Sequence, residues 1–322
     1  MTRRLTPERL QAMTLRRQFP AIRGRRGTAI DELYRRLGPV QTQVPSSAFV
    51  FMASRLPGVS YDAVVAAFEE HDLVKASNIR ATVHSSNRVQ HAWLAAVAER
   101  PRSLLLRNQL RLDRRTPSDV TTEIERLTSG GWRERKALVE DVRSWLAEHE
   151  SPASADALST TMSANLVWGH AALVRRPGDT RWETRTDTLH RYAPDLYPVP
   201  RVTTAEATRR LVRQHLGAYG PATRRDIAWW MGTRLTDVDQ AVDGLGEEVV
   251  RLPGPEDSVY LDLAEPPRGN GSDPGLRLLP EFDGLLLGYE GPGRDRFVEP
   301  EHLGRLTGRT AGNGLMRPLV LN

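Results

Sequence analysis

Apolar residues along the chain recur mostly at the three- and four-residue spacing of helices, with shorter stretches that alternate as strands do. The first helix is predicted from Thr6 to about Phe19, with Pro7 at its first helical position. Further helices and two short strands follow in the order helix 28–37, helix 46–56, helix 60–70, strand 73–75, strand 78–83 and helix 86–99. Residues 1–116 are therefore predicted to form one helix-rich module.

The next two blocks share one order of elements. In residues 117–199 the pattern predicts helices over 134–148 and 154–162, then a hairpin of strands 167–175 and 180–185. In residues 200–264 it predicts helices over 203–216, 223–231 and 236–245, then strands 248–252 and 258–263. Helices followed by a β-hairpin are typical of winged-helix modules, and the repetition strengthens that interpretation.

The last segment, residues 265–322, has a different character. A linker rich in proline and glycine over 265–275 precedes residues 276–289, which are predicted to be strands broken at Pro280 and Gly284. Residues 317–322 read as a strand without a partner, so we expect the final β-rich module to be incomplete in this sequence. The predicted fold class is α+β, mainly α, with tandem winged-helix modules and β-hairpin wings around a basic concave surface.

The charge of the chain is basic and unevenly distributed. The net charge is +5, and all but two of the 45 Lys and Arg residues are arginine. GC-rich codon usage can explain that preference by itself, so the distribution is the better test. Residues 1–40 carry ten arginines against three carboxylates, whereas residues 121–160 carry five cations against eight carboxylates. This asymmetry indicates one basic face, which suits a nucleic-acid partner.

Several classes of protein are excluded by what the sequence lacks. The chain has no cysteine, which removes disulfides, cysteine-ligated zinc, iron–sulfur clusters and thiol nucleophiles. No apolar run approaches a membrane span, and the first residues do not resemble a signal peptide, so we expect a cytoplasmic protein. No phosphate-binding loop, paired-carboxylate site or metal-ligand spacing is present, and we expect neither a cofactor nor a metal.

Two glutamines stand close together in a short segment between predicted helices. Gly38-Pro39 closes one helix and Pro45 disfavours helix at the preceding residue, so residues 40–44 should be extended. Alternation then directs Gln41 and Gln43 to one side and the residues between and beside them inward. A pair of neutral amides can hold a water molecule without burying a charge. The alternative is two solvated loop amides.

A second candidate segment, residues 80–84, alternates as a strand and would place Arg80, Thr82 and His84 on one face. One interpretation places these side chains against a phosphate of the nucleic-acid partner that the charge distribution suggests. The other is that His84 is a structural histidine that holds the strand to a neighbouring helix.

Arg224 and Arg225 open a predicted helix after Pro221, where backbone N–H groups and guanidinium groups can meet a DNA phosphate together. The alternative for both is a solvated helix face. Trp229-Trp230 is predicted to be core, because the helical phase buries at least one of the two rings. Phe282-Asp283 is predicted to lock the last module to the others.

Four motifs occur in the order seen in one known family: Gln41-Thr42-Gln43, residues 80–84, residues 219–230 and residues 279–289. In these motifs the chain resembles the bacterial winged-helix DNA glycosylases of the AlkZ and YcaQ type. The resemblance implies removal of N7-alkylated guanine, with unhooking of interstrand crosslinks, and it implies that Gln41 and Gln43 are catalytic. The Gln-x-Gln version resembles members found beside genes for DNA-alkylating antibiotics, which implies self-resistance.

The chemistry of the lesion is compatible with this resemblance. Alkylation at N7 makes guanine a cationic leaving group that needs no general acid, so two amide oxygens can aim a water and stabilise a cationic sugar. We therefore expect a monofunctional DNA glycosylase of base excision repair, acting as a monomer on double-stranded DNA in the nucleoid. The alternative is a DNA-binding transcriptional regulator without enzyme activity, although no heptad or dimerisation helix is visible.

Overall fold

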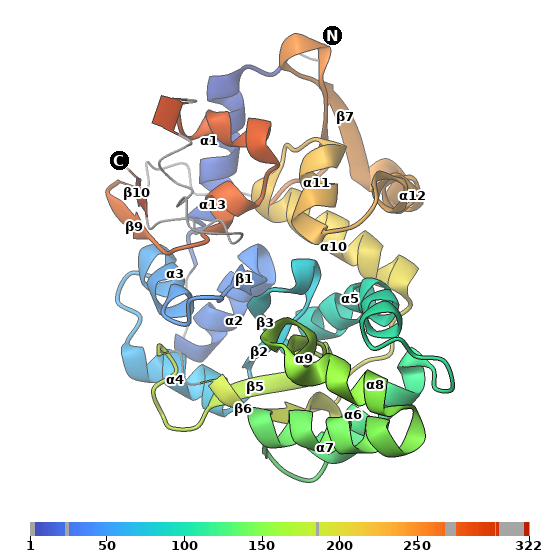
Figure 1. The fold of residues 1–322 in the computed structure, drawn as a ribbon. Helices are drawn as coiled ribbons and strands as arrows, with labels where there is room; N and C mark the ends of the chain where they lie inside the picture. The colour runs from blue at the N-terminus through green and yellow to red at the C-terminus, as the bar shows by residue number, and fades with distance from the viewer. Residues whose placement is uncertain are drawn as a thin grey trace.

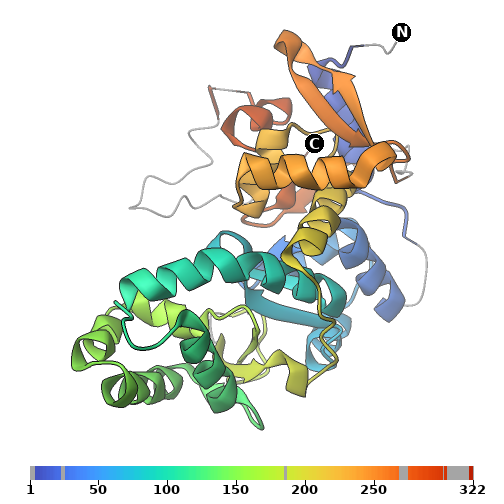
Figure 2. The same cartoon turned by 90° about the vertical axis from the view of Figure 1, so that its right-hand side faces the viewer.

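A computed structural model describes residues 4–22, 26–184, 187–267, 275–299, 301–302 and 319–321. These residues form two lobes, one above the other in Figure 1. The lower, here called the sheet lobe, comprises the described residues between 26 and 199. The upper, here called the C-terminal lobe, comprises the described residues between 204 and 302, strand 319–321 and the N-terminal helix. Helices α5 (Arg88–Gln109) and α10 (Thr204–Tyr219) pack against each other where the lobes meet, as Figure 2 shows from the side.

The first part of the sheet lobe contains the predicted helices and three strands. They are α2 (Arg26–Leu37), β1 (Val40–Gln41), α3 (Ser47–Arg55), α4 (Tyr61–Glu69), β2 (Leu73–Ser77) and β3 (Val83–Asn87). The strand predicted over 78–83 was wrong, because the turn η1 (Ile79–Ala81) lies there and strand β3 follows it. Helix α5 also begins later than predicted. Asn87 is its N-cap in a reciprocal pair with Gln90, which fixes the start of the helix.

One antiparallel sheet runs through the whole sheet lobe. Its strand order is β1-β3-β2-β5-β6-β4, with β4 (Arg133–Glu134), β5 (Leu173–Pro177) and β6 (Asp187–Tyr192). Strand β2 pairs with β5, so the strands on either side of the predicted module boundary at residue 116 belong to the same sheet. Helices α2, α4 and α5 pack against β2 and β3, at the end of the sheet that carries β1.

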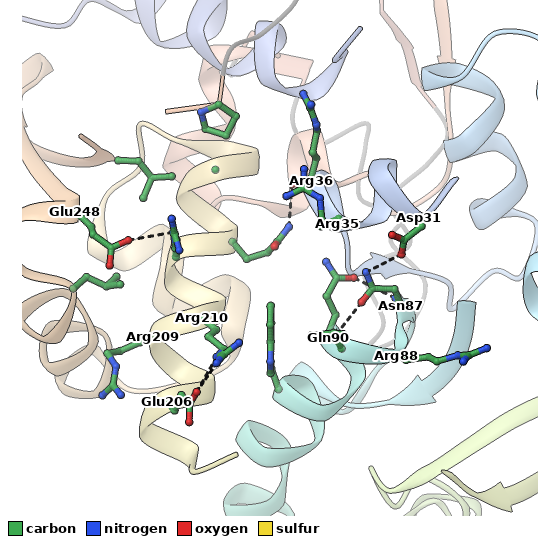
Figure 3. A pocket seen from close by; sticks show the side chains of 18 of the residues that line it. Asp31, Arg35, Arg36, Asn87, Arg88, Gln90, Glu206, Arg209, Arg210 and Glu248 are labelled. Atoms are coloured by element: carbon green, nitrogen blue, oxygen red, sulfur yellow. Dashed lines mark hydrogen bonds and ion pairs between the residues drawn. The ribbon is translucent and has the colours of Figure 1, made fainter. Parts of the chain in front are cut away.

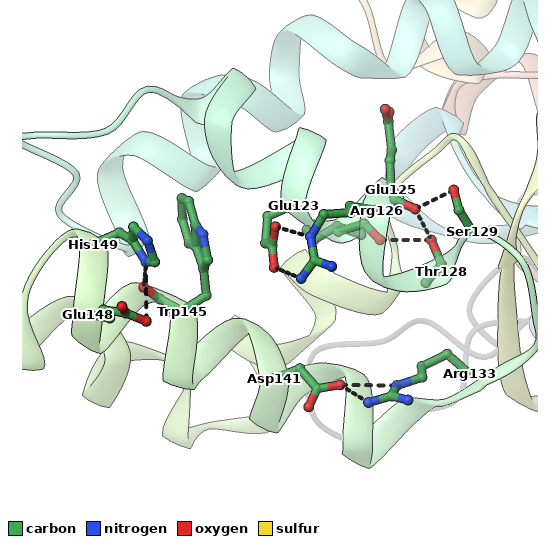
Figure 4. Close-up of polar contacts among 11 residues, drawn as sticks. Glu123, Glu125, Arg126, Thr128, Ser129, Arg133, Asp141, Trp145, Glu148 and His149 are labelled. Carbon is green, nitrogen blue, oxygen red and sulfur yellow. Dashed lines mark hydrogen bonds and ion pairs between the residues drawn. The ribbon is translucent and has the colours of Figure 1, made fainter.

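The remaining helices of the sheet lobe are α6 (Pro117–Thr128), α7 (Arg135–His149), α8 (Pro152–Asp156) and α9 (Thr161–Trp168). The α7 prediction is confirmed, whereas α6 was not predicted. Figure 4 shows two arginines beside α6 and α7 engaged by carboxylates, Arg126 by Glu123 at 2.8 Å and Arg133 by Asp141. These two arginines are therefore already paired within this surface.

The predicted hairpin of this lobe was displaced along the chain. Residues 167 and 168 end helix α9, and the hairpin consists of β5 and β6. Residues 180–184 form no strand because the Trp182 ring is buried and stacks on Phe68 with 4.8 Å between centroids. The backbone oxygen of Trp182 also accepts a hydrogen bond from Lys75, which pins the loop to the sheet. Residue 185, at the end of the predicted strand, lies outside the described residues.

The C-terminal lobe contains the three helices and the hairpin predicted for residues 200–264. After α10 come α11 (Arg224–Met231), α12 (Leu235–Leu245), β7 (Val249–Pro253) and β8 (Val259–Leu263). An isolated bridge between Ala222 and Leu261 adds a third short strand segment beside the hairpin. This stretch of the chain therefore has the predicted elements in the predicted order.

Helix α1 (Pro7–Gln18) packs on α10, so it belongs to the C-terminal lobe although it begins the chain. Arg17 makes a buried two-pronged ion pair with Asp262, with both N–O distances at 2.8 Å. Near the start of α1, the backbone N–H of Leu5 donates to the Pro253 oxygen at 2.8 Å. The N-terminal helix is thus held by residues more than 200 positions away in sequence.

The C-terminal segment is only partly strand. Strand β9 (Arg277–Leu279) is confirmed, but the strand predicted farther along was wrong, because residues 284–287 form the short helix α13 (Gly284–Leu287). Asp283 caps this helix by accepting from the Leu285 N–H at 2.8 Å. Strand β10 (Leu319–Leu321) pairs antiparallel with β9, so the final strand has the partner that the sequence did not reveal.

Asp283 also joins the C-terminal lobe to the sheet lobe. Its carboxylate accepts two hydrogen bonds from the Arg55 guanidinium on α3, at 2.8 and 3.0 Å, and both side chains are fully buried. Phe282 is buried beside α13. The predicted locking role of this dipeptide is confirmed. Across the described part of the chain, no helix is both long and apolar enough to span a membrane.

Candidate active site

The two glutamines lie on one side of the segment that begins with β1. This segment pairs with β3, with Gln41 opposite His84, and the Thr42 N–H donates to the Val83 oxygen at 2.8 Å. Thr42 is buried, Gln41 is half-buried and Gln43 is exposed. The predicted alternation of side chains is therefore confirmed.

The start of β1 is fixed by a close approach at Gly38. A Cβ atom there would lie 2.7 Å from both the Gln90 Oε1 and the Tyr34 oxygen, so only glycine fits without movement. Gln90 also donates from Nε2 to the Tyr34 oxygen at 2.7 Å. Helix α5 thereby holds the end of α2 and determines where β1 begins.

The side-chain oxygens of the two glutamines have different partners. Gln41 Oε1 accepts a hydrogen bond from Arg80 Nη2 at 2.8 Å. Gln43 Oε1 lies 3.4 Å from the backbone N–H of Val83, a long and weak contact. Gln43 therefore keeps most of its capacity for an external partner.

Arg80 is held between the two lobes. It lies in turn η1 with φ 55°, and its Nη1 donates to the Trp230 backbone oxygen on α11. Its guanidinium stands over the Trp229 ring at 5.0 Å from the centroid. Burial lowers the pKa of Arg80 to about 10, so the side chain stays charged at neutral pH.

Trp229 forms a wall beside the glutamines, and the sequence did not predict this role. Its ring is half-buried and carries a second guanidinium, that of Arg294, at 4.7 Å from the centroid. The ring and Val44, the neighbour of Gln43, both pack against a hydrophobic cluster of Phe282, Leu286 and Leu287. Trp230 is buried, so the core prediction is confirmed for that ring. The position of Trp229 along the predicted helix could have identified it as the ring that is not fully buried. Arg294 follows no periodic pattern that would have identified it.

Thr82 is half-buried and His84 is buried beside this surface. The Thr82 hydroxyl donates to the Ile79 oxygen at 3.3 Å within the turn. His84 is 2% exposed, and its Nδ1 lies 3.1 Å from the Thr82 oxygen. Because residues 79–81 form a turn, Arg80 is not on one strand with Thr82 and His84 as predicted, although it contacts Gln41, the cross-strand partner of His84. The position of His84 favours the structural interpretation over contact with DNA.

The buried ring of His84 is expected to make the fold sensitive to acid. Burial, reinforced by the nearby Arg80 charge, lowers its pKa to about 3. In the unfolded chain the ring has a pKa near 6.5, so below that pH the unfolded state binds a proton that the folded state does not. Stability therefore falls as the pH is lowered below about 6.5. At pH 5, His84 alone should remove about 2 kcal/mol from the free energy of unfolding.

Urea unfolding at pH 7.5 and pH 5 tests this expectation. The variant His84→Asn should lose less stability on acidification than the wild type, because it has no proton to gain. Equal losses in the two proteins would contradict the role assigned to this ring.

Arg224 and Arg225 are exposed at the start of α11, where Thr223 and Asp226 cap the helix reciprocally. Arg224 is paired with Asp239 on α12 at 2.6 Å. Among the described residues Arg225 has no ion-pair partner. It precedes Trp229 by four residues and therefore lies on the same face of the helix. Arg225 is thus the one of the two arginines that is on the side of the glutamines.

A cavity of about 1120 Å³ lies elsewhere, among α2, α5 and α10 (Figure 3). Neither glutamine lines it. Several of its arginines are already paired with carboxylates, as with Arg210 and Glu206 at 2.6 Å and Arg213 and Glu248 at 3.3 Å. In the described ranges, no cluster of histidines and carboxylates is arranged to hold a metal ion.

Comparison with known proteins decides the family. A family model described as DNA glycosylase AlkZ-like matches residues 34–321. The chain belongs to the AlkZ-like DNA glycosylase family. The resemblance found in the sequence motifs is confirmed. This membership supports DNA glycosylase activity and a part in DNA repair, with DNA as the substrate.

A solved structure of this family has a similar fold. The Streptomyces sahachiroi DNA glycosylase AlkZ superposes with a TM-score of 0.77 at 20% sequence identity, covering 99% of this chain and 86% of that chain. At this identity the likeness establishes the fold, which is mainly helical with small antiparallel sheets. No curated protein matches the chain.

Proposed function

We propose that this protein hydrolyses the N-glycosidic bond of N7-alkylguanine in double-stranded DNA. The observation that supports this specificity is the pair Gln41 and Gln43, which project from one side of an extended segment beside Trp229 and Arg80. Among the described residues neither glutamine is hydrogen-bonded to a carboxylate. A site of neutral amides lacks a strong general acid or base, so it suits a base that already carries a positive charge.

The proposed reaction moves positive charge from the base to the sugar. The C1′–N9 bond breaks, its electron pair neutralises the alkylated base, and the sugar becomes cationic. A water then bonds to C1′ and releases a proton to solvent. Amide dipoles placed where the positive charge develops stabilise this step, and they hold the water without a change of protonation.

The lysines support a monofunctional enzyme. A glycosylase that also cleaves the DNA strand uses an amine to form a Schiff base with the sugar. The two lysines of the chain are Lys75 and Lys136. Lys75 is buried and donates to Asp187 at 3.0 Å, while Lys136 is in the first turn of α7. Neither belongs to the segments around the glutamines, so we propose that water is the nucleophile.

The surroundings of the pair support binding to duplex DNA. The order of three helices and a hairpin in residues 204–263 is that of a winged helix, and we propose that residues 117–199 form a second such module. We also propose that the enzyme works as a monomer on the nucleoid.

A surface formed by two lobes suits lesions that cannot be fully flipped, such as bulky natural-product adducts and interstrand crosslinks. Self-resistance to a DNA-alkylating antibiotic is the corresponding biological role.

A duplex with one N7-methylguanine tests the reaction. We expect abasic sites and free 7-methylguanine from this duplex and none from the matched unmodified duplex.

The winged-helix order also favours a second candidate, a regulator that binds DNA without catalysing a reaction on it. Binding of both duplexes without base release would favour that regulator and contradict the glycosylase.

Exposed arginines near the pair should contribute to affinity without reading sequence. We expect Arg225→Ala to weaken binding to any duplex about equally, by roughly threefold to tenfold, and to reduce the salt dependence by about one phosphate contact. Arg224→Ala is the matched control, because its guanidinium is already paired with Asp239. Fluorescence anisotropy over a range of salt concentrations measures both. An effect confined to one DNA sequence would instead indicate base readout.

A further inference from the structure

The contact between Arg80 and Gln41 fixes which way the Gln41 amide faces. A guanidinium has only N–H donors, so the Gln41 atom that lies 2.8 Å from Arg80 Nη2 must be the oxygen. The Nε2 group of Gln41 is consequently directed away from Arg80. This orientation follows from hydrogen-bond chemistry alone, because the reverse would place two sets of donors against each other.

Arg80 is itself held by contacts from a different lobe. Its second terminal nitrogen donates to the Trp230 oxygen, and the Trp229 ring lies under the guanidinium plane. At Gly232, which ends α11 with φ 67°, a Cβ atom would lie only 3.0 Å from Arg80 Cγ. The end of α11 therefore fits closely around this side chain.

The backbone at Arg80 is also strained. Arg80 and Ala81 have φ values of 55° and 54°, a left-handed conformation that is unfavourable for residues with a side chain. Such a conformation persists where surrounding contacts require it. The contacts that require it here are those that bring the guanidinium to Gln41 and to the end of α11.

In the described part of the chain no carboxylate forms an ion pair with Arg80, although the side chain remains charged. Its charge is stabilised by a backbone oxygen, an amide oxygen and an aromatic face. The guanidinium cannot swing out toward a DNA phosphate without breaking these contacts. Arg80 is therefore better suited to hold a neighbour than to bind the DNA backbone.

We infer that Arg80 is a positioning residue that gives the two glutamines different roles in the reaction. This inference rests on the function proposed above. Arg80 occupies the Gln41 oxygen and offsets its dipole, so Gln41 presents its N–H donors to the oxygen of the water and not to the cationic sugar. Gln43, whose oxygen has only one weak contact, then supplies the negative end of the dipole to the cationic sugar. Docking of α11 on turn η1 thus completes the catalytic arrangement.

A double-mutant cycle tests this inference. Single-turnover excision of N7-methylguanine is measured for Arg80→Ala, Gln41→Ala and the combined variant, with DNA affinity and melting temperature measured alongside. We expect each single change to slow excision about tenfold to a hundredfold, and the combination to slow it no more than about threefold beyond the larger single effect. DNA affinity and its salt dependence should stay within about twofold of the wild type.

Arg80→Lys serves as a matched control. Lysine keeps the charge but loses the planar set of donors, so it should slow excision nearly as much as alanine. Additive effects in the cycle, or a lower salt dependence for Arg80→Ala, would overturn the inference and identify a phosphate contact.

A spectroscopic readout separates this inference from the proposed function. The side-chain amide signals of Gln41 in an NMR spectrum should be sharp and dispersed in the wild type and should collapse toward solvent-like positions in Arg80→Ala. If the wild type releases no base yet the signals behave this way, the proposed function fails and the positioning contact stands. Unchanged Gln41 signals in a folded Arg80→Ala variant would refute the positioning contact whatever the activity.

Discussion

Replacing Gln43 by alanine is expected to lower the single-turnover rate of base excision by roughly ten- to a thousand-fold. Gln43 is exposed beside Trp229, and its oxygen has only a 3.4 Å contact with the Val83 N–H, so it is available for the reacting sugar and water. The loss of one placed dipole accounts for an effect of this size. The measurement is the rate of abasic-site formation with enzyme in excess over a duplex that contains N7-methylguanine.

Two matched variants sharpen this result. Gln43→Asp creates a Gln-x-Asp pattern with a reach shorter by one methylene, and excision of the cationic lesion should persist. Gln43→Glu keeps the length of glutamine and replaces the amide with a carboxylate, so it separates the effect of charge from that of reach. Because the side chain is outside the core, melting temperature should barely change in any of the three, and DNA affinity should barely change for Gln43→Ala. A Gln43→Ala enzyme with the wild-type rate would exclude this residue from the chemistry.

Removing the buried carboxylate of Asp283 is expected to destabilise the protein by about 3–5 kcal/mol. Asp283→Ala leaves the Arg55 guanidinium fully buried with no carboxylate, and it also removes the cap of α13. The expected loss is a large fraction of the stability of an ordinary domain. Urea unfolding measures it as a shift of the midpoint, with the slope checked for two-state behaviour.

The exposed pair of Arg4 and Asp257 provides the control. Asp257 is almost fully exposed, so Asp257→Ala should change stability by less than about 1 kcal/mol. Replacing both buried partners, in Arg55→Met with Asp283→Leu, should cost less than Asp283→Ala alone, since no unpaired charge remains. Similar stability for Asp283→Ala and Asp257→Ala would show that the buried pair does not hold the lobes together.

Local signals explain why much of the fold could be predicted from the sequence. Thr203 and Thr223 begin helices by capping them, and Gly220-Pro221 separates those helices. Alternating residues then mark the hairpin of β7 and β8. These signals act within a few residues of each other, so residues 204–263 were predicted in the right order.

The errors occur where distant contacts decide the structure. The turn at residues 79–81 exists because Arg80 bonds across to Gln41 and α11, and no local pattern indicates a left-handed arginine. Helix α1 belongs to the C-terminal lobe because Arg17 pairs with Asp262, 245 residues away. Residues 180–184 are a loop because the Trp182 ring is buried against Phe68.

The candidate site shows the same contrast between local signals and distant contacts. The prolines at positions 39 and 45 were enough to predict an extended segment in which Gln41 and Gln43 share a side. The partner of each amide oxygen was not predictable, because Arg80 and Val83 reach the glutamines through the pairing of β1 with β3 and the docking of α11. The pair was visible in the sequence, whereas its unequal environment became visible only in the folded chain.

The most direct measurement compares the wild type with a Gln41→Ala, Gln43→Ala double variant on a duplex that carries one N7-methylguanine. Both proteins are first shown to have the same melting temperature and the same affinity for DNA, and abasic sites are then counted under single-turnover conditions. We predict rapid release of 7-methylguanine by the wild type and release near the uncatalysed background by the double variant. Excision by the double variant at the wild-type rate would contradict catalysis by the glutamine pair.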